Sequence, residues 1–283
     1  MAALSGYRSI FLSDLHLGSP DCQADYLLDF LRHLRCRQLY LVGDILDLQA
    51  LARRPFWPRT HGEVLARLLE LPGRGIRVCY VPGNHDHAFR ALAGSRIGAI
   101  EVCRETIHVG ADGRRFRVSH GDEFDQEGIG RSWLTRIGDS GHRLLCFLNR
   151  HFNRLRRRAG LPYFPLSVHA KSRIGRALAF IQDFEQRAAA RAEAEGLDGQ
   201  ICGHIHFAAI RTIGSRLYLN CGDFVEHCTA LAENADGGFE LLHWTERKAV
   251  LAEESLRAQP SLQATALTAF AAMERLSELD LAA

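Results

Sequence analysis

The first 82 residues alternate short apolar runs with amphipathic segments, and this alternation is the strongest constraint on the fold. Apolar runs at Tyr7–Leu12, Gln38–Val42 and Ile76–Val81 each end in a turn or polar residue, as buried strands do. Between them, Cys22–Leu34 and Gly62–Leu71 carry apolar residues at helical spacing. This β-α-β-α-β order predicts an α/β fold with a parallel sheet and helices on its faces.

Two later regions are rich in short strands. Predicted strands at Glu105–Val109 and Arg115–Ser119 are separated by a glycine-containing turn at 110–113, and Ile100–Val102 precedes them. A second group follows at Gly199–Cys202, Ala208–Ile213, Leu217–Asn220, Thr229–Glu233 and Phe239–His243. Close spacing and turn residues favour hairpin-like, antiparallel pairing, so we predict that both groups form a second sheet.

A helical insertion is predicted between these two groups, over residues 123–195. It contains an aromatic-rich break at 161–165 and a helix at about Val168–Glu195. Its segment 131–158 holds one acid, Asp139, and eight arginines, at positions 131, 136, 143, 150, 154, 156, 157 and 158. We predict that the insertion forms a cap with apolar and basic faces, which suits an anionic lipid interface. A helix packed on its own domain with a solvated basic face is the alternative.

The predicted domain organisation follows from these segments. Residues 1–122 and 196–250 form the core, and 123–195 form the cap. The Ala/Leu-rich segment 251–283 has helical spacing and is predicted to be a helical or mobile tail. Its role and the oligomeric state stay open.

Composition indicates a soluble, globular protein. Hydrophobic residues make up 47% and charged residues 24% of the 283 residues. No apolar run reaches the roughly 18 to 20 residues that span a bilayer, and the N-terminus lacks the features of a secretory signal. We therefore expect a cytoplasmic protein whose eight scattered cysteines are free thiols.

Five short segments with metal-ligand residue types each follow a predicted strand. Any one of them is weak evidence, because an isolated histidine is more often a surface or hydrogen-bonded residue than a ligand. Ligands of open α/β sheets collect beyond the carboxyl ends of the strands, so these segments are expected to meet in one site. Mixed carboxylate and imidazole ligands suit Mn, Fe, Zn or Co better than Ca. The candidate ligands are Asp14, His16, Asp44, Asn84, His120, His204 and His206.

The order D-x-H, G-D, G-N-H-D, H-G-D, G-H-x-H resembles that of the calcineurin-like metallophosphoesterase superfamily, over residues 8–122 and 198–225. The resemblance implies two packed mixed β-sheets flanked by helices, in a four-layer sandwich. It also implies a phosphoesterase with two divalent ions, with manganese favoured. One ion would bind Asp14, His16, Asp44 and His206, and the other would bind Asp44, Asn84, His120 and His204. Two such ions can clamp the attacking and leaving oxygens of a phosphoryl displacement.

His85 and Asp86 complete the third segment. In the resembling family, the histidine after the asparagine is not a ligand and lies near the leaving-group oxygen, as a proton donor or a phosphate-stabilising cation. We predict that role for His85, with Asp86 orienting or supporting its imidazole. A packing role beside the metal ligands is the alternative.

The substrate is suggested by a finer resemblance. The cap composition and the segments Ser13–Ser19 and Gly203–Asp223 resemble the UDP-2,3-diacylglucosamine diphosphatase branch, which splits a pyrophosphate to UMP and a lipid 1-phosphate at the inner face of the inner membrane. Lys171 and Arg173 are then candidates for substrate contact. The lipid A enzymes of that branch have arginine where this sequence has His85.

Other substrates and classes remain open. A phosphodiesterase acting on soluble nucleotides, nucleic acid or another phospholipid headgroup has the same metal motif. The apolar residues among the arginines are rich in leucine rather than stacking aromatics, which argues against nucleic acid. A non-catalytic metal-binding scaffold is disfavoured, because every ligand position is filled.

Overall fold

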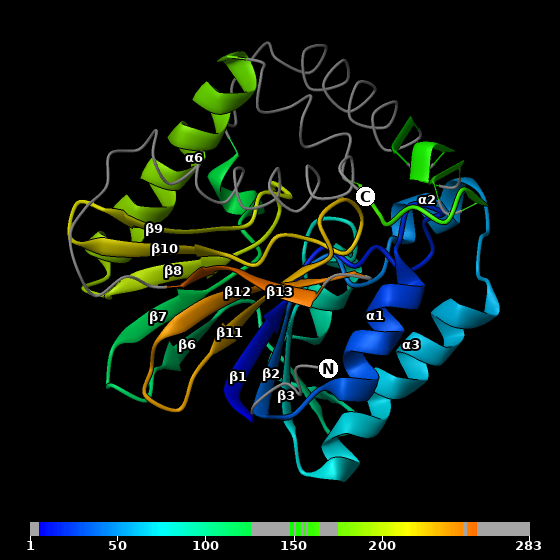
Figure 1. Cartoon of the computed structure of the whole chain (residues 1–283). Helices are drawn as coiled ribbons and strands as arrows, with labels where there is room; N and C mark the ends of the chain where they lie inside the picture. The colour runs from blue at the N-terminus through cyan, green and yellow to red at the C-terminus, as the bar shows by residue number, and fades with distance from the viewer. Residues whose placement is uncertain are drawn as a thin grey trace.

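Two β-sheets lie face to face at the centre of the molecule (Figure 1). The computed structural model describes residues 6–125, 148–149, 151–153, 155–156, 158–164, 175–245 and 248–253. The larger sheet has the order β13-β12-β11-β1-β2-β3-β5-β4, and the smaller has the order β6-β7-β8-β10-β9.

The element bounds agree closely with the predicted runs. The larger sheet consists of β1 (Tyr7–Leu12), β2 (Cys36–Val42), β3 (Arg77–Val81), β4 (Arg96–Ile97), β5 (Ile100–Val102), β11 (Thr229–Glu233), β12 (Phe239–Trp244) and β13 (Lys248–Glu253). The smaller sheet consists of β6 (Thr106–Val109), β7 (Arg115–Val118), β8 (Gly199–Cys202), β9 (Ala209–Ile213) and β10 (Arg216–Asn220). The helices are α1 (Ala24–His33), α2 (Leu48–Arg53), α3 (Arg59–Glu70) and α6 (Gly175–Ala194), with 3-10 turns η1 (Leu71–Arg74), η2 (His87–Leu92) and η3 (Asp122–Phe124).

Side-chain alternation along the strands builds four layers. In β1, Ile10 packs with the apolar faces of α1 and α3, whereas its neighbour Phe11 faces the other sheet. Phe11 stacks on Tyr40 with ring centroids 4.6 Å apart and shares a core with Phe116 of the smaller sheet. Phe184 of α6 packs on the outer face of that sheet. The predicted sandwich of two mixed sheets flanked by helices is therefore confirmed.

Parallel pairing places the ends of several strands at one edge. β1, β2 and β3 are parallel neighbours, as the sequence predicts. In the smaller sheet, β7, β8 and β10 are also parallel neighbours. Ligands collect at the carboxyl ends of such strands, and each of the five candidate metal segments follows one of them.

Three strands predicted for the second sheet lie in the first. β5 pairs parallel with β3, while β11 pairs antiparallel with β1 and with β12. Every residue of β11 is buried, which fits a strand placed between two others and between two layers. Short apolar runs identify strands but not their partners, so the sequence could not assign the sheet.

The C-terminal boundary also needs correction. Residues 251–253, predicted to begin the helical tail, belong to β13, which pairs antiparallel with β12. Residues 254–283 lie outside the described part of the chain.

The predicted cap is described only in part, since 126–147 and 165–174 lie outside the described residues. Helix α6 forms the C-terminal part of the predicted cap. It packs on β8, β9 and β10 as the fourth layer. Within the predicted cap, Tyr163 contacts Tyr26 of α1, with ring centroids 5.9 Å apart. A cap over the rest of 123–195 stays a prediction.

Two simpler expectations can be checked against the described residues. Their seven cysteines are free thiols, as predicted; Cys146 lies outside this part. Among the described helices, none is long and apolar enough to cross a membrane.

Candidate metal centre

Loops from both sheets bring the seven candidate ligands to one edge. Those that follow β1, β2 and β3 meet those that follow β7 and β8. For clarity, the Asp14 half denotes Asp14, His16 and His206, and the Asp44 half denotes Asp44, Asn84, His120 and His204.

In the Asp14 half, one carboxylate divides its oxygens between the backbone and the imidazoles. Asp14 Oδ2 accepts a hydrogen bond from the His204 amide at 2.9 Å. Its other oxygen, Oδ1, lies 3.3 Å from His206 Nε2 and 3.8 Å from His16 Nε2. The side chain of Asp14 is fully buried, so its charge is not screened by water.

Asp44 divides its oxygens in the same way and faces both halves. Its Oδ1 accepts the amide hydrogen of His85 at 2.8 Å. Its Oδ2 lies 3.8 Å from His16 Nε2 and 3.3 Å from His120 Nε2. One oxygen therefore lies close to an imidazole of each half.

The other members of the Asp44 half surround His120. The carboxamide oxygen of Asn84 lies 3.1 Å from His120 Nε2. The ring of His204 lies beside that of His120, with centroids 5.1 Å apart. His204 Nε2 is engaged outside the cluster, 2.9 Å from Asp125 Oδ2, so its Nδ1 is the nitrogen left for the centre.

The backbone at the site is held in a conformation that non-glycine residues rarely adopt. Five candidate ligands have positive φ: Asp14 at 53°, His16 at 49°, Asp44 at 53°, His204 at 70° and His206 at 51°. Each such residue costs on the order of 1–3 kcal/mol and persists where surrounding structure enforces it. Strain concentrated on these five residues indicates a functional arrangement.

Two glycines leave room for the ligands. A Cβ on Gly43 would lie 2.1 Å from His120 Nδ1, and φ at Gly43 is 81°. A Cβ on Gly83 would lie 2.2 Å from Asp44 Oδ1. Any side chain at either position would displace a candidate ligand.

Two carboxylates that the sequence analysis missed orient the imidazoles. Asp47 lies 3.1 Å from His16 Nδ1 and 3.0 Å from His85 Nδ1. Asp223, after β10, lies 3.6 Å from His206 Nδ1 and also contacts His227. A Gly-Asp pair shortly after a strand was the available signal for Asp223, as the pair directly after β2 was for Asp44.

The predicted support of His85 by Asp86 is wrong on this geometry. The Asp86 carboxylate accepts backbone amide hydrogens from Asp44, Ile45, Leu46 and Gly83, at 2.6 to 3.3 Å. It thus ties the loop after β2 to the loop after β3, and Asp47 is the acid beside the His85 ring. His85 and Asp86 are adjacent in sequence, but the Asp86 carboxylate is not the partner of the His85 ring.

Burial and charge set unusual proton affinities in the cluster. Burial alone would lower the pKa of each histidine, but nearby carboxylates outweigh it. Asp44 is the main cause that raises the pKa of His120 to about 10, and Asp14 the main cause that raises that of His206 to about 9. Burial would raise the pKa of Asp14, yet His206 and His16 hold it well below its usual range. The cluster therefore stabilises positive charge among its carboxylates.

The donor set fits a divalent metal ion. Asp14 Oδ1 and His16 Nε2 are buried, make no hydrogen bond within the described part of the chain, and face each other at 3.8 Å. This gap is too long for a hydrogen bond and suits two ligands that each lie roughly 2 Å from one cation. Described groups that could hold an ion include Asp14, His16 and His206, and also Asp14, Asp44 and His120.

The predicted substrate residues Lys171 and Arg173 lie outside the described residues.

Comparison with known families decides the class. The family described as "Calcineurin-like phosphoesterase" matches residues 7–208. The chain belongs to this family. Its Asp/His clusters are candidate sites for divalent metals.

Among curated relatives, this phosphoesterase is similar to a protein named UDP-2,3-diacylglucosamine hydrolase from Porphyromonas gingivalis. The two are 32% identical over 120 residues, which is 40% of this chain and 45% of that protein. The chain therefore matches less than half the length of this relative.

The chain is also similar to solved structures with which it shares little sequence. Vacuolar protein sorting 29 from Cryptosporidium parvum has a TM-score of 0.45 and 10% identity, over 89% of this chain and 100% of that chain. The phosphoesterase Yfce from E. coli has a TM-score of 0.41 and 13% identity, over 88% of this chain and 99% of that chain.

Proposed function

We propose that this phosphoesterase hydrolyses the pyrophosphate of a UDP-linked glycolipid, UDP-2,3-diacylglucosamine, to UMP and a lipid 1-phosphate. The main support for the reaction class is the position of Asp44 Oδ2. This oxygen lies 3.8 Å from His16 Nε2 and 3.3 Å from His120 Nε2. The 32% identical relative named as a UDP-2,3-diacylglucosamine hydrolase supports the substrate.

The division of ligands between two ions that the family resemblance implies is retained in this proposal. Asp44 would be shared between an ion held by the Asp14 half and an ion held by the rest of the Asp44 half. Manganese is our preferred ion, with Fe, Zn or Co as alternatives for the same donors. Bound ions would supply a low-pKa water as nucleophile and would stabilise negative charge on the phosphoryl oxygens.

His85 is proposed to protonate the leaving-group oxygen. Its Nδ1 is 3.0 Å from Asp47, and its Nε2 lies 4.0 Å from Asp44 Oδ2. The side chain is 30% exposed, so Nε2 can be reached from solvent at the edge of the cluster. Asp47 would fix the orientation of the ring, as the placement of a general acid requires.

The membrane part of the proposal depends on the predicted cap. Its arginines and leucines would bring the enzyme to an anionic surface at the inner face of the inner membrane, and Lys171 and Arg173 would contact the substrate. Asp86 keeps the role described above, as a link between loops.

A direct assay tests the reaction and the substrate together. Protein loaded with Mn²⁺ is incubated with UDP-2,3-diacylglucosamine in mixed micelles, and beside it with an aryl phosphodiester. We expect UMP release and higher kcat/KM for the lipid. Turnover of the aryl ester alone would contradict the glycolipid substrate. Turnover of neither, with metal bound, would support a non-catalytic scaffold instead.

A further inference from the structure

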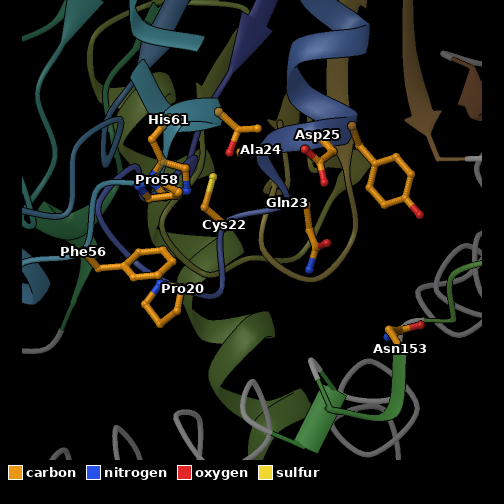
Figure 2. A pocket seen from close by; sticks show the side chains of 11 residues that line it. Pro20, Cys22, Gln23, Ala24, Asp25, Phe56, Pro58, His61 and Asn153 are labelled. Atoms are coloured by element: carbon orange, nitrogen blue, oxygen red, sulfur yellow. The ribbon is translucent and has the colours of Figure 1, made fainter. Parts of the chain in front are cut away.

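Close to the candidate centre lies a cavity of about 170 Å³ that none of the proposed metal ligands lines. Figure 2 shows Cys22, Gln23 and Asp25, at the start of α1, on one side, and Phe56 and His61 on another. Drug-sized ligands occupy roughly 300–1,000 Å³, so this cavity suits one compact part of a substrate rather than a long acyl chain.

The cavity wall is connected to the loop that carries His16. The Gly18 amide donates a hydrogen bond to His61 Nδ1 at 3.0 Å. Gly18 lies two residues beyond His16, so their Cα atoms are at most about 7 Å apart. A group in the cavity and a phosphate at the centre can therefore belong to one substrate molecule.

The chemistry of the wall argues against an anion. Among the described residues that line it, none is arginine or lysine, and Asp25 brings an exposed carboxylate. Burial lowers the pKa of His61, so this ring is neutral near pH 7. Such a wall suits an uncharged group with hydroxyl or N–H donors.

Two polar atoms of the wall are left for a ligand. His61 is only 2% exposed, and because its Nδ1 accepts the Gly18 amide, Nε2 carries the proton. Within the described part of the chain, no hydrogen bond from His61 Nε2 is present, and none reaches Gln23 Oε1, although Gln23 Nε2 donates to the Val225 carbonyl at 3.3 Å. The wall thus offers one donor and one acceptor.

Phe56 adds a surface for stacking. Its side chain is on the cavity wall in Figure 2, and the residue is 37% exposed. Its ring meets the edge of His61 with centroids 5.6 Å apart. Exposed aromatic rings bind the faces of nucleobases, and a carboxylate such as Asp25 can accept the hydroxyls of a ribose.

We infer that this cavity is a nucleoside subsite, which takes the pyrimidine base and ribose of the substrate while the metal centre takes its phosphates. A uracil ring has both the carbonyl oxygen that His61 Nε2 would bind and the N–H that Gln23 Oε1 would accept. The inference rests on the proposed function, and it separates a nucleotide-linked substrate from a simple phospholipid.

Binding of three probes tests the subsite without turnover. Calorimetry on Mn²⁺-loaded protein gives Kd for UMP, ribose 5-phosphate and inorganic phosphate. We expect UMP to bind roughly tenfold more tightly than ribose 5-phosphate, because only UMP brings a base to Phe56. Phe56→Leu should remove most of that ratio. Phe180→Leu, which changes another exposed phenylalanine, should keep it.

The carboxylate has its own test. Asp25→Asn should weaken UMP and ribose 5-phosphate severalfold relative to inorganic phosphate. The subsite is refuted if UMP binds no more tightly than ribose 5-phosphate, or if neither binds measurably. UMP release from UDP-2,3-diacylglucosamine by the unmodified protein is measured in parallel. Its absence would contradict the proposed function, and the binding ratios would still decide on the subsite.

Discussion

The two halves of the candidate centre are supported by different groups. In the Asp14 half, buried carboxylates lie behind both imidazoles, with Asp47 3.1 Å from His16 and Asp223 3.6 Å from His206. In the Asp44 half, His120 Nδ1 donates to the backbone carbonyl of Val42 at 3.0 Å.

This difference predicts unequal affinity for metal. A carboxylate behind an imidazole raises its basicity and fixes its orientation more strongly than a neutral carbonyl does. The Asp14 half should therefore hold its ion more tightly. The ion of the Asp44 half should exchange more readily, since His204 depends on Asp125, whose side chain is 49% exposed.

The largest effect is expected where the halves meet. Asp44→Ala removes the oxygen that faces both His16 and His120, so neither half keeps its full ligand set. We expect kcat to fall by more than the roughly 10⁴-fold upper range for one general acid or base, and metal content per chain to drop. Elemental analysis and initial rates measure both. Full activity with unchanged metal content would refute the shared position of Asp44.

His85→Gln separates chemistry from metal binding. The change removes a proton donor that lies 4.0 Å from Asp44 Oδ2 but leaves the proposed ligands in place. We expect kcat to fall by roughly 10²-fold or more, with metal content unchanged. The deficit should shrink for a substrate whose leaving group needs no proton, such as a nitrophenyl ester. Loss of metal in this variant would instead assign His85 to the ligand set.

A matched pair of variants tests the inequality between halves. Asp223→Asn weakens the support of His206, and we expect metal affinity to fall by roughly 10- to 100-fold. Asp125→Asn weakens the exposed partner of His204 and should cost only a fewfold loss, because water can replace it. Competition with a chelator gives both affinities, and melting of the metal-free proteins checks their folding. Equal losses would show that the two halves are supported alike.

Most of this arrangement could be predicted from the sequence. Buried runs followed by Asp, Asn or His predicted strands and candidate ligands together, because ligands of open α/β sheets collect beyond the carboxyl ends of the strands. The partner of each strand could not be predicted. The apolar pattern of β11 suits either sheet, and only the assembled layers place it beside β1.

Supporting residues were harder to find than ligands. Asp86 follows His85 directly, yet Asp47, 38 positions away, is the residue at its ring. His108 is the opposite case, a buried histidine that is not a candidate ligand. It packs against Phe11 and lies 3.0 Å from Glu233. Side-chain partners across loops depend on backbone conformations, such as positive φ at Asp44, that local sequence does not specify.

The smallest expected effect is the pH dependence of metal affinity. It tests whether the carboxylates of both halves keep their histidines protonated. In metal-free protein, burial disfavours charged imidazoles, yet Asp14 raises the pKa of His206 to about 9, and Asp44 that of His120 to about 10. At pH 7 both rings hold a proton that a metal ion must displace, so affinity should rise by up to about tenfold per pH unit for each proton released.

The same protons should change stability in opposite directions in the metal-free and the metal-loaded protein as pH rises. A raised histidine pKa stabilises the metal-free fold fully below about pH 6.5, and that contribution is lost as pH rises through 9 to 10. Metal binding tightens over this range, so the difference in Tm between metal-loaded and metal-free protein should widen from about pH 6.5 to about 9. Melting curves at several pH values and fixed Mn²⁺ measure it. A constant difference would mean that the imidazoles are neutral before metal binds, and that the carboxylates of the two halves do not hold them charged.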